Sequence, residues 1–147
     1  MQQTDARLPN RIKRYGCYYM VLGRMVEIDT GHTFTADEII ITLEICESKK
    51  YILENCKIQN PDGVLKILYQ IANSSKKILQ IGSIVYGKVE YWGWVIDKAY
   101  DFVIRKYSTK NGNHFMLLNI GKGIEYNPDE SVITFDVEMD ILYKKII

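Results

Sequence analysis

The sequence predicts an α+β fold in which a helical first half is followed by an antiparallel β-sheet. Helix-forming patterns and helix caps occupy residues 17–73, whereas β-branched and aromatic residues dominate from about residue 77 onward. Runs of helices followed by runs of strands are typical of α+β domains rather than of alternating α/β folds. At 147 residues the chain can bury one substantial core without disulfides or metals, so we expect a single domain over residues 1–147.

The segment from Cys17 to Asp29 predicts a buried helix. Its apolar residues fall on nearly every side of a helix, which indicates a central helix packed against several neighbours. Gly16, directly before it, would let the backbone turn sharply. The preceding residues 1–14 are polar and basic, and we expect them to form a solvated arm.

Two further helices are predicted by the residues that begin them. Residues 35–38 have the pattern of a capping box, and the helix that follows runs to about Ser48. Cys46 lies on the apolar face of this helix and is expected to be a small core residue. Residues 60–62 begin the other helix, which Asn73 closes, because proline suits the first helical position and acids suit the first turn.

Six segments of the second half are rich in β-branched and aromatic residues and are predicted to be strands. They are Ile78–Tyr86, Tyr91–Ile96, Tyr100–Tyr107, His114–Ile120, Gly123–Asn127 and Val132–Tyr143. Asn111-Gly112 is a strong signal for a tight hairpin between two of them. We therefore expect an antiparallel sheet.

The charge balance and the cysteines restrict the possible functions. The formal net charge is +1, so no overall attraction to nucleic acid or to an acidic membrane is implied. No stretch has the length of a membrane span, and residues 1–14 lack the apolar core of a secretory signal. Three cysteines without metal-ligand spacing are typical of free thiols in a reducing compartment. We expect a cytoplasmic protein with no metal and no cofactor.

Cys17 and His114 are the residues that could carry thiol chemistry. A cysteine at a helix N-terminus feels the positive end of the helix dipole, which favours the thiolate. The chain has two histidines; His114 begins a strand and could act as a general base there, whereas nothing around the loop residue His32 suggests a partner. The alternative is that Cys17 is a buried structural cysteine and His114 a polar residue at a strand end.

The residue that would orient the imidazole depends on the register of the next hairpin. A four-residue loop at residues 119–122 would bring His114 opposite Asn127 on the same face of the sheet. A two-residue loop at residues 121–122 would bring it opposite Asp129 instead. We prefer Asn127, and Asp129 remains the alternative.

Three short motifs resemble the papain-like cysteine peptidases. They are Gly16-Cys17 opening an apolar helix, His114-Phe115 opening an apolar strand, and Asn127-Pro128 closing the next strand. They are most similar to small bacterial and phage proteins of the bacteriocin-processing, C39-like branch. The resemblance implies a papain-like fold, with the nucleophile Cys17 on the helical half and with His114 and Asn127 on the sheet as the other members of a catalytic triad.

The resemblance also implies an amide side chain that stabilises the oxyanion, usually a glutamine several residues before the cysteine. Gln2 and Gln3 are distant in the sequence, so Asn10 is predicted for this role. The chain also departs from the family pattern in having Tyr18 after the cysteine, where the family usually has glycine.

Three functions compete. The first is a cysteine peptidase or amidase that cleaves an amide bond in a peptide or peptidoglycan-like substrate, with Trp92 and Trp94 either lining a substrate groove or packing in the sheet. The second is a catalytically inactive papain-like domain that serves as a binding or host/phage-interaction module. The third is a nucleic-acid-binding protein that uses the basic arm, which the neutral overall charge and the lack of a readout motif disfavour.

Overall fold

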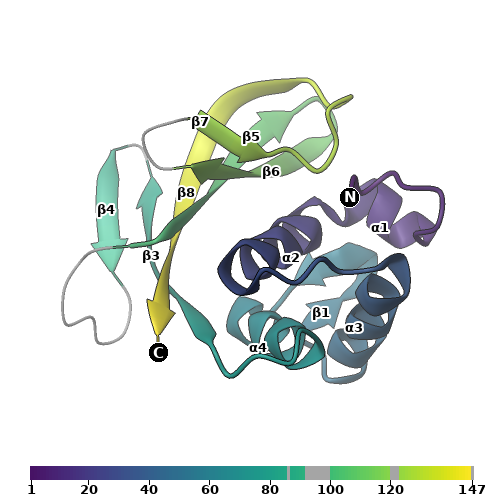
Figure 1. Ribbon diagram of the computed structural model, residues 1–147. Helices are drawn as coiled ribbons and strands as arrows, with labels where there is room; N and C mark the ends of the chain where they lie inside the picture. The colour runs from purple at the N-terminus through teal and green to yellow at the C-terminus, as the bar shows by residue number, and fades with distance from the viewer. Residues whose placement is uncertain (86, 92–99, 120–122, 147) are drawn as a thin grey trace.

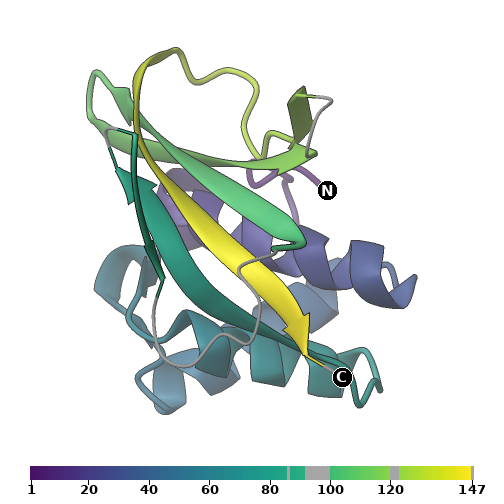
Figure 2. The ribbon, with the colours of Figure 1, turned by 90° about the vertical axis from the view of Figure 1, so that its left-hand side faces the viewer.

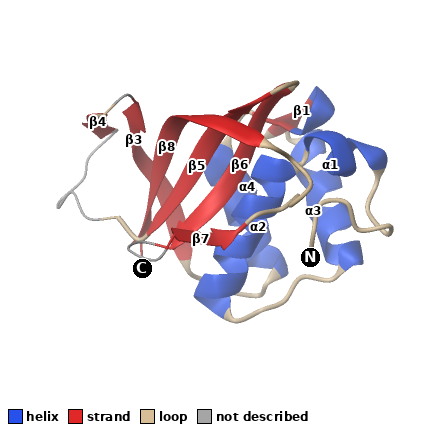
Figure 3. Ribbon diagram, turned by 90° about the horizontal axis from the view of Figure 1, so that it is seen from above, coloured by secondary structure: helices blue, strands red, loops and turns tan. Residues whose placement is uncertain are grey.

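A computed structural model describes residues 1–85, 87–91, 100–119 and 123–146. Helices cover one face of an antiparallel sheet, and the two layers are seen side by side in Figures 1 and 3. This arrangement confirms the α+β class. The helical half consists of α1 (Asn10–Tyr15), α2 (Cys17–Thr30), α3 (Ala36–Ser48) and α4 (Pro61–Ile71), with a small hairpin of β1 (Ile52–Leu53) and β2 (Lys57–Ile58) around the 3-10 turn η1 (Glu54–Cys56).

The large sheet has the strand order β4-β3-β8-β5-β6-β7, and each neighbouring pair is antiparallel. The strands are β3 (Lys77–Val85), β4 (Lys88–Tyr91), β5 (Phe102–Thr109), β6 (Gly112–Asn119), β7 (Gly123–Tyr126) and β8 (Thr134–Ile146). β8 is the long central strand and crosses the sheet diagonally in Figure 2. It pairs with β5 over most of its length and with β3 only in its second half.

The predicted helix starts are confirmed. Thr35 accepts a hydrogen bond from the backbone N–H of Glu38, and the Glu38 carboxylate accepts one from the Thr35 N–H, so α3 begins with a complete capping box. The side chain of Asn60 accepts a hydrogen bond from the Gly63 N–H, and Pro61 is the first residue of α4. Local side-chain chemistry therefore determines where these two helices begin.

α2 is the central helix, as predicted. It contacts α1 and α4 within the helical half and β6 in the sheet. Val21, Leu22, Met25 and Val26 are fully buried, and Cys46 of α3 lies in the same core. Among the described residues, no helix has both the length and the apolar character that crossing a membrane requires.

Two features differ from the prediction. The N-terminal segment is not a solvated arm, because it forms α1 and buries Leu8 and Ile12 in the core. The hairpin of β1 and β2 was not predicted, since its strands are two residues each and show no periodicity. Of the predicted strand Tyr91–Ile96, only Tyr91 lies within the described residues, as the last residue of β4.

Candidate functional site

A cavity of about 1060 Å³ lies between the helical half and the sheet, at the start of α2. One wall comes from the N-terminal segment, the α1–α2 junction and the β1–β2 turn, and the other comes from β5, β6 and the start of β8. Cys17 and His114 both line it. The structure therefore brings these two predicted residues to one cavity from positions far apart in the sequence.

Gly16 determines how closely α1 and α2 approach at this cavity. A Cβ at this position would lie 2.7 Å from the carbonyl oxygen of Ile12 and 2.8 Å from its Cα, so no side chain fits. The Gly16 N–H donates a hydrogen bond to the same carbonyl at 2.8 Å, where α1 ends. Cys17 is consequently the first residue of α2, directly after a junction that requires glycine.

Tyr18 fixes the start of α2 against the sheet. Its ring stacks on that of Phe115 in β6, with ring centroids 4.5 Å apart. Its hydroxyl lies 2.5 Å from the hydroxyl of Tyr143 in β8. The residue that departs from the family pattern therefore has a packing role here, and it brings Cys17 next to the strand that carries His114.

The Cys17 thiol is nearly buried, with 8% of the residue exposed. Burial raises the pKa of the thiol, and the backbone N–H groups of Phe115 and Tyr18 near the sulfur offset only part of this increase. The carboxylate of Asp129 also raises the pKa. The net direction is opposite to the one expected for a helix N-terminus, because the lost hydration of a buried thiolate outweighs what the nearby amides return.

His114 lies in β6 opposite Tyr107 of β5 and is 2% exposed. Its Nε2 is 2.7 Å from Oδ1 of Asn127, and the same Oδ1 accepts a hydrogen bond from the Asp129 N–H at 3.2 Å. Because the Asp129 N–H can only donate, the atom that receives this bond is the amide oxygen of Asn127. Because this oxygen can only accept, Nε2 carries the proton in the neutral imidazole, and Nδ1 is then the nitrogen able to take one.

The predicted contact between His114 and Asn127 is confirmed by this hydrogen bond, but the predicted register is wrong. The four-residue loop would have paired Leu118 with Gly123, whereas β6 and β7 pair Asn119 with Gly123. An irregularity one residue further along the ladder changes the register again. The chain leaves the sheet after β7, so a side-chain bond rather than ladder pairing brings the amide to the imidazole.

Asp129, the alternative partner, is also at the cavity but is engaged elsewhere. Its Oδ1 accepts hydrogen bonds from the N–H of Ser131 at 3.0 Å and from the Ser131 hydroxyl at 2.6 Å. Among the described residues, the acceptor for the His114 ring is the amide oxygen of Asn127. The geometry therefore selects Asn127 over Asp129.

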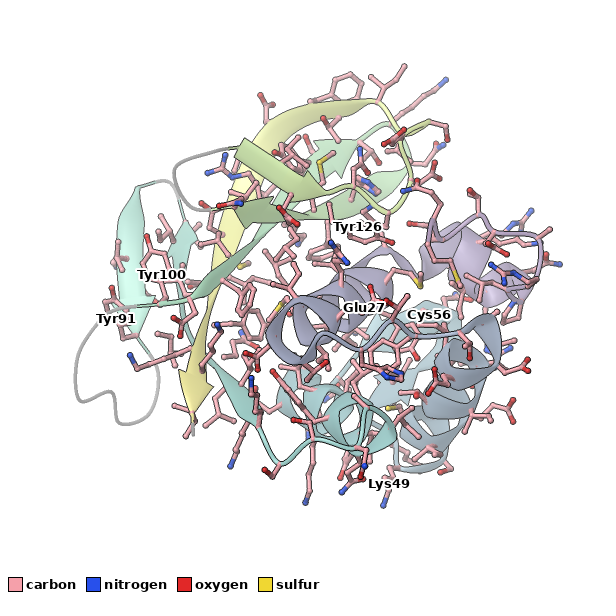
Figure 4. All side chains as sticks on the ribbon, viewed as in Figure 1. Glu27, Lys49, Cys56, Tyr91, Tyr100 and Tyr126 are labelled. Carbon is pink, nitrogen blue, oxygen red and sulfur yellow. The ribbon has the colours of Figure 1, made fainter. Side chains whose placement is uncertain are left out.

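Residues 1–3 hold the turn that carries Asn127. The Tyr126 hydroxyl donates a hydrogen bond to the carbonyl of Met1, the Gln2 side chain donates to the Asn127 carbonyl at 2.8 Å, and the Gln3 N–H donates to the Pro128 carbonyl at 2.8 Å. Figure 4 shows Tyr126 over α2 in this region. The N-terminal segment thus supports the imidazole's partner from outside the sheet.

Gln3, and not Asn10, is the buried amide side chain that lines the cavity. Asn10 is exposed at the start of α1 and is not part of the cavity lining, so it does not meet Cys17. The Gln3 side chain donates hydrogen bonds to the carbonyls of Lys13 at 3.0 Å and Ile12 at 3.4 Å. Its Oε1 is buried without a hydrogen-bond partner in the described part of the chain. The sequence did not indicate Gln3, because its separation from Cys17 does not reveal that the N-terminal segment folds back onto the cavity.

The turn between β1 and β2 forms part of the helical wall, with Cys56 labelled in Figure 4. Asn55 and Cys56 have φ values of 57° and 54°, in the left-handed region that residues other than glycine rarely adopt. Strained turns of this kind cluster at functional sites. Asparagine tolerates this region better than most residues, so Asn55 is the local signal for this turn in the sequence.

The remaining predicted features lie away from the cavity or outside the described residues. Trp92 and Trp94, the predicted groove residues, lie outside the residues that the structure describes. His32 does have a partner, since its Nε2 is 3.1 Å from the Glu38 carboxylate. Within residues 1–85, 87–91, 100–119 and 123–146, no group of three or more His, Cys, Asp or Glu side chains is placed to hold a metal ion.

Comparison with known proteins gives a family without an assigned activity. The family model described as "Protein of unknown function, DUF261" matches residues 1–145, so the chain belongs to the DUF261 family. No curated protein and no solved structure matches the chain.

Proposed function

We propose that this member of the DUF261 family is a papain-like thiol hydrolase that cleaves an amide bond in a peptide or peptidoglycan-like substrate. The observation that carries the proposal is the 2.7 Å hydrogen bond between His114 and Asn127 at the cavity that Cys17 also lines. A buried imidazole with one nitrogen held by an amide oxygen and the other unprotonated is suited to take a proton from a thiol.

In the proposed reaction the sulfur of Cys17 attacks the carbonyl carbon while its proton passes to Nδ1 of His114. A C–S bond forms, and the carbonyl electrons move to the oxygen, where the Cys17 N–H at the start of α2 stabilises the charge. The C–N bond then breaks, and the imidazolium gives its proton to the leaving amine. Water then attacks the thioester carbonyl while one of its protons passes to His114. The C–S bond breaks, the acid leaves, and the imidazolium returns the proton to the sulfur, which restores the thiol.

The raised pKa of Cys17 bears on the first step. The resting thiol is protonated, so its proton moves to His114 during the attack rather than before it. An oxyanion donor contributes about 3 kcal/mol in enzymes that use one, and we assign this part to the backbone N–H of Cys17. The Gln3 amide, which is bonded to two carbonyls, serves to hold the N-terminal segment.

A second function, a catalytically inactive papain-like domain used as a binding or host/phage-interaction module, is favoured by one observation. The environment of Cys17 disfavours the thiolate, and only 8% of the residue is exposed. In that case the same cavity would bind a ligand without turnover, and Cys17→Ser would leave binding unchanged. In the hydrolase, Cys17→Ser abolishes activity.

The cysteines also bear on where the protein works. Cys17, Cys46 and Cys56 are unpaired and buried. Free thiols persist in reducing compartments. We therefore place the protein in the cytoplasm as part of the proposal.

Alkylation by iodoacetamide between pH 5 and 9, read at each cysteine by peptide mass spectrometry, tests the thiol chemistry. Burial raises the pKa of all three thiols, to about 12 for Cys46 and about 11 for Cys56. Cys17 should nevertheless react about tenfold faster than the other two, because in the proposed mechanism His114 takes its proton. His114→Ala should remove this advantage, whereas the control His32→Ala should not. A Cys17 rate that does not depend on His114 would contradict the hydrolase and favour the binding module.

A further inference from the structure

The cavity concentrates positive charge that the chain as a whole does not carry. Its lining contains the cationic side chains of Arg14, Lys57, Lys106 and Lys110 and one carboxylate, Asp129. With His114 neutral, this gives the lining a net charge of +3, whereas the whole chain carries +1. The rest of the chain is therefore net negative. A cleft lined by one sign of charge raises the local concentration of ligands of the opposite sign.

The cationic side chains stand on both walls and are mostly available to a ligand. Arg14 and Lys57 belong to the helical wall, and Lys106 and Lys110 belong to the sheet wall. Lys106 lies 3.4 Å from the Glu138 carboxylate. Arg14, Lys57 and Lys110 are exposed and form no ion pair with any residue that the structure describes. A bound anion would thus meet charges that the protein itself leaves largely unpaired.

Exposed apolar side chains border the same cavity. Ile133, directly before β8, and Phe135, the second residue of β8, are 76% and 63% exposed, and Tyr15 at the end of α1 is 46% exposed. Exposed apolar side chains grouped at a cleft mark a contact surface. A polypeptide supplies carboxylates, apolar side chains and an amide bond together, whereas a nucleic acid supplies no amide bond in its backbone.

We infer that the cavity binds an acidic peptide, meaning a polypeptide segment with Asp or Glu side chains a few residues from an apolar side chain. This inference rests on the proposed function and names its substrate class. The carboxylates lie against Lys57 and Lys110 on the two walls, and the apolar side chain lies against Ile133 and Phe135. The amide bond between them passes over Cys17.

Binding of two labelled peptides to the full-length Cys17→Ser variant, followed by fluorescence anisotropy, tests this. One peptide contains glutamates beside a phenylalanine, and its twin has glutamine at each glutamate position. The glutamate peptide should bind about fivefold more tightly at low salt, and added salt should reduce the difference. Lys57→Gln and Lys110→Gln should each weaken binding of the glutamate peptide by about twofold to fivefold. The control Lys66→Gln, at an exposed position of α4 outside the cavity, should not change the affinity for the glutamate peptide.

Equal affinity for the two peptides would overturn the inference. So would a loss of affinity in the Lys66 variant as large as that in the Lys57 and Lys110 variants. A single-stranded RNA that binds more tightly than the glutamate peptide, with the same dependence on Lys57 and Lys110, would overturn it in favour of nucleic acid. The alkylation experiment distinguishes failure of this inference from failure of the proposed function. Alkylation that depends on His114, without a glutamate preference, refutes only the substrate class. A glutamate preference without such alkylation refutes only the hydrolase.

Discussion

The two walls of the cavity hold their candidate residues by different means. On the helical wall, Cys17 is fixed by the backbone, since the junction at Gly16 leaves no room for a side chain. On the sheet wall, His114 is fixed by a hydrogen bond to Asn127, whose turn is held in place by residues 1–3. Close packing of backbone admits almost no substitution, whereas a hydrogen-bond network can lose one member at a time.

Because of this difference, substitutions in the helical wall should mainly affect stability, whereas substitutions in the sheet wall should mainly affect the candidate site. A change at the helical junction displaces a backbone segment and should lower the stability of the whole domain. A change in the sheet wall should first free the imidazole and only then affect stability. Substitutions in the two walls can therefore test whether the cavity is built as the geometry indicates.

The largest effect on the free energy of unfolding is expected for Gly16→Ala. Its Cβ would meet the backbone of Ile12 at 2.7 Å and 2.8 Å, and backbone atoms cannot move aside as a flexible side chain can. Overpacking of this kind should lower the free energy of unfolding by about 3 kcal/mol, measured by urea denaturation.

Gly23→Ala is the matched control, because it adds the same methyl group within α2, the helix that Gly16 directly precedes. The nearest atom to a Cβ at Gly23 is Cδ1 of Ile39 at 3.9 Å, which is ordinary contact. Alanine is the better helix former, so this variant should gain about 1 kcal/mol. Equal effects at the two glycines would show that the α1–α2 junction is not close-packed.

Asn127→Ala should have an intermediate effect on stability and a large effect on the chemistry. It leaves the buried Nε2–H of His114 without its acceptor, which should cost about 1–2 kcal/mol of stability. Without a fixed imidazole, the alkylation rate of Cys17 should fall toward that of the His114→Ala variant. Unchanged alkylation kinetics would mean that Asn127 does not orient the imidazole.

Asn119→Ala is the control for this change. Its side chain makes a 3.4 Å hydrogen bond to Glu125 on the exposed surface of the same hairpin. Its loss should change the free energy of unfolding by no more than about 0.5 kcal/mol. The alkylation rate of Cys17 should remain that of the unmodified protein.

What the sequence predicted correctly depends on short-range chemistry. The capping box of residues 35–38 and the start of α4 at residues 60–62 need only neighbouring side chains, and both are confirmed. The hairpin at Asn111 is confirmed as well, although its two-residue loop is Lys110-Asn111, one residue earlier than predicted. Such features are decided within a few residues and can be read from sequence alone.

What could not be predicted depends on contacts between distant segments. Gln3 reaches the cavity because its N–H bonds the Pro128 carbonyl, at the other end of the chain. The raised pKa of Cys17 follows from burial under the sheet, which no local pattern encodes. The partner of His114 was named correctly from an incorrect register, because a side-chain bond beyond the ladder makes the contact.

The smallest effect is expected for Asp129→Asn on the pH profile of Cys17 alkylation, and it distinguishes Asn127 from Asp129 as the partner of His114. Asp129 raises the pKa of the Cys17 thiol, since its negative charge disfavours a second negative charge on the sulfur. Asp129→Asn removes that charge, so the pKa of the Cys17 thiol should fall. The pH profile of Cys17 alkylation should then move to lower pH, and the dependence on His114 should persist. Glu130→Gln, a neighbouring exposed carboxylate outside the cavity lining, should leave the profile in place. Loss of the His114 dependence in Asp129→Asn would instead mean that the carboxylate orients the imidazole, and Asn127 would then only shape the turn.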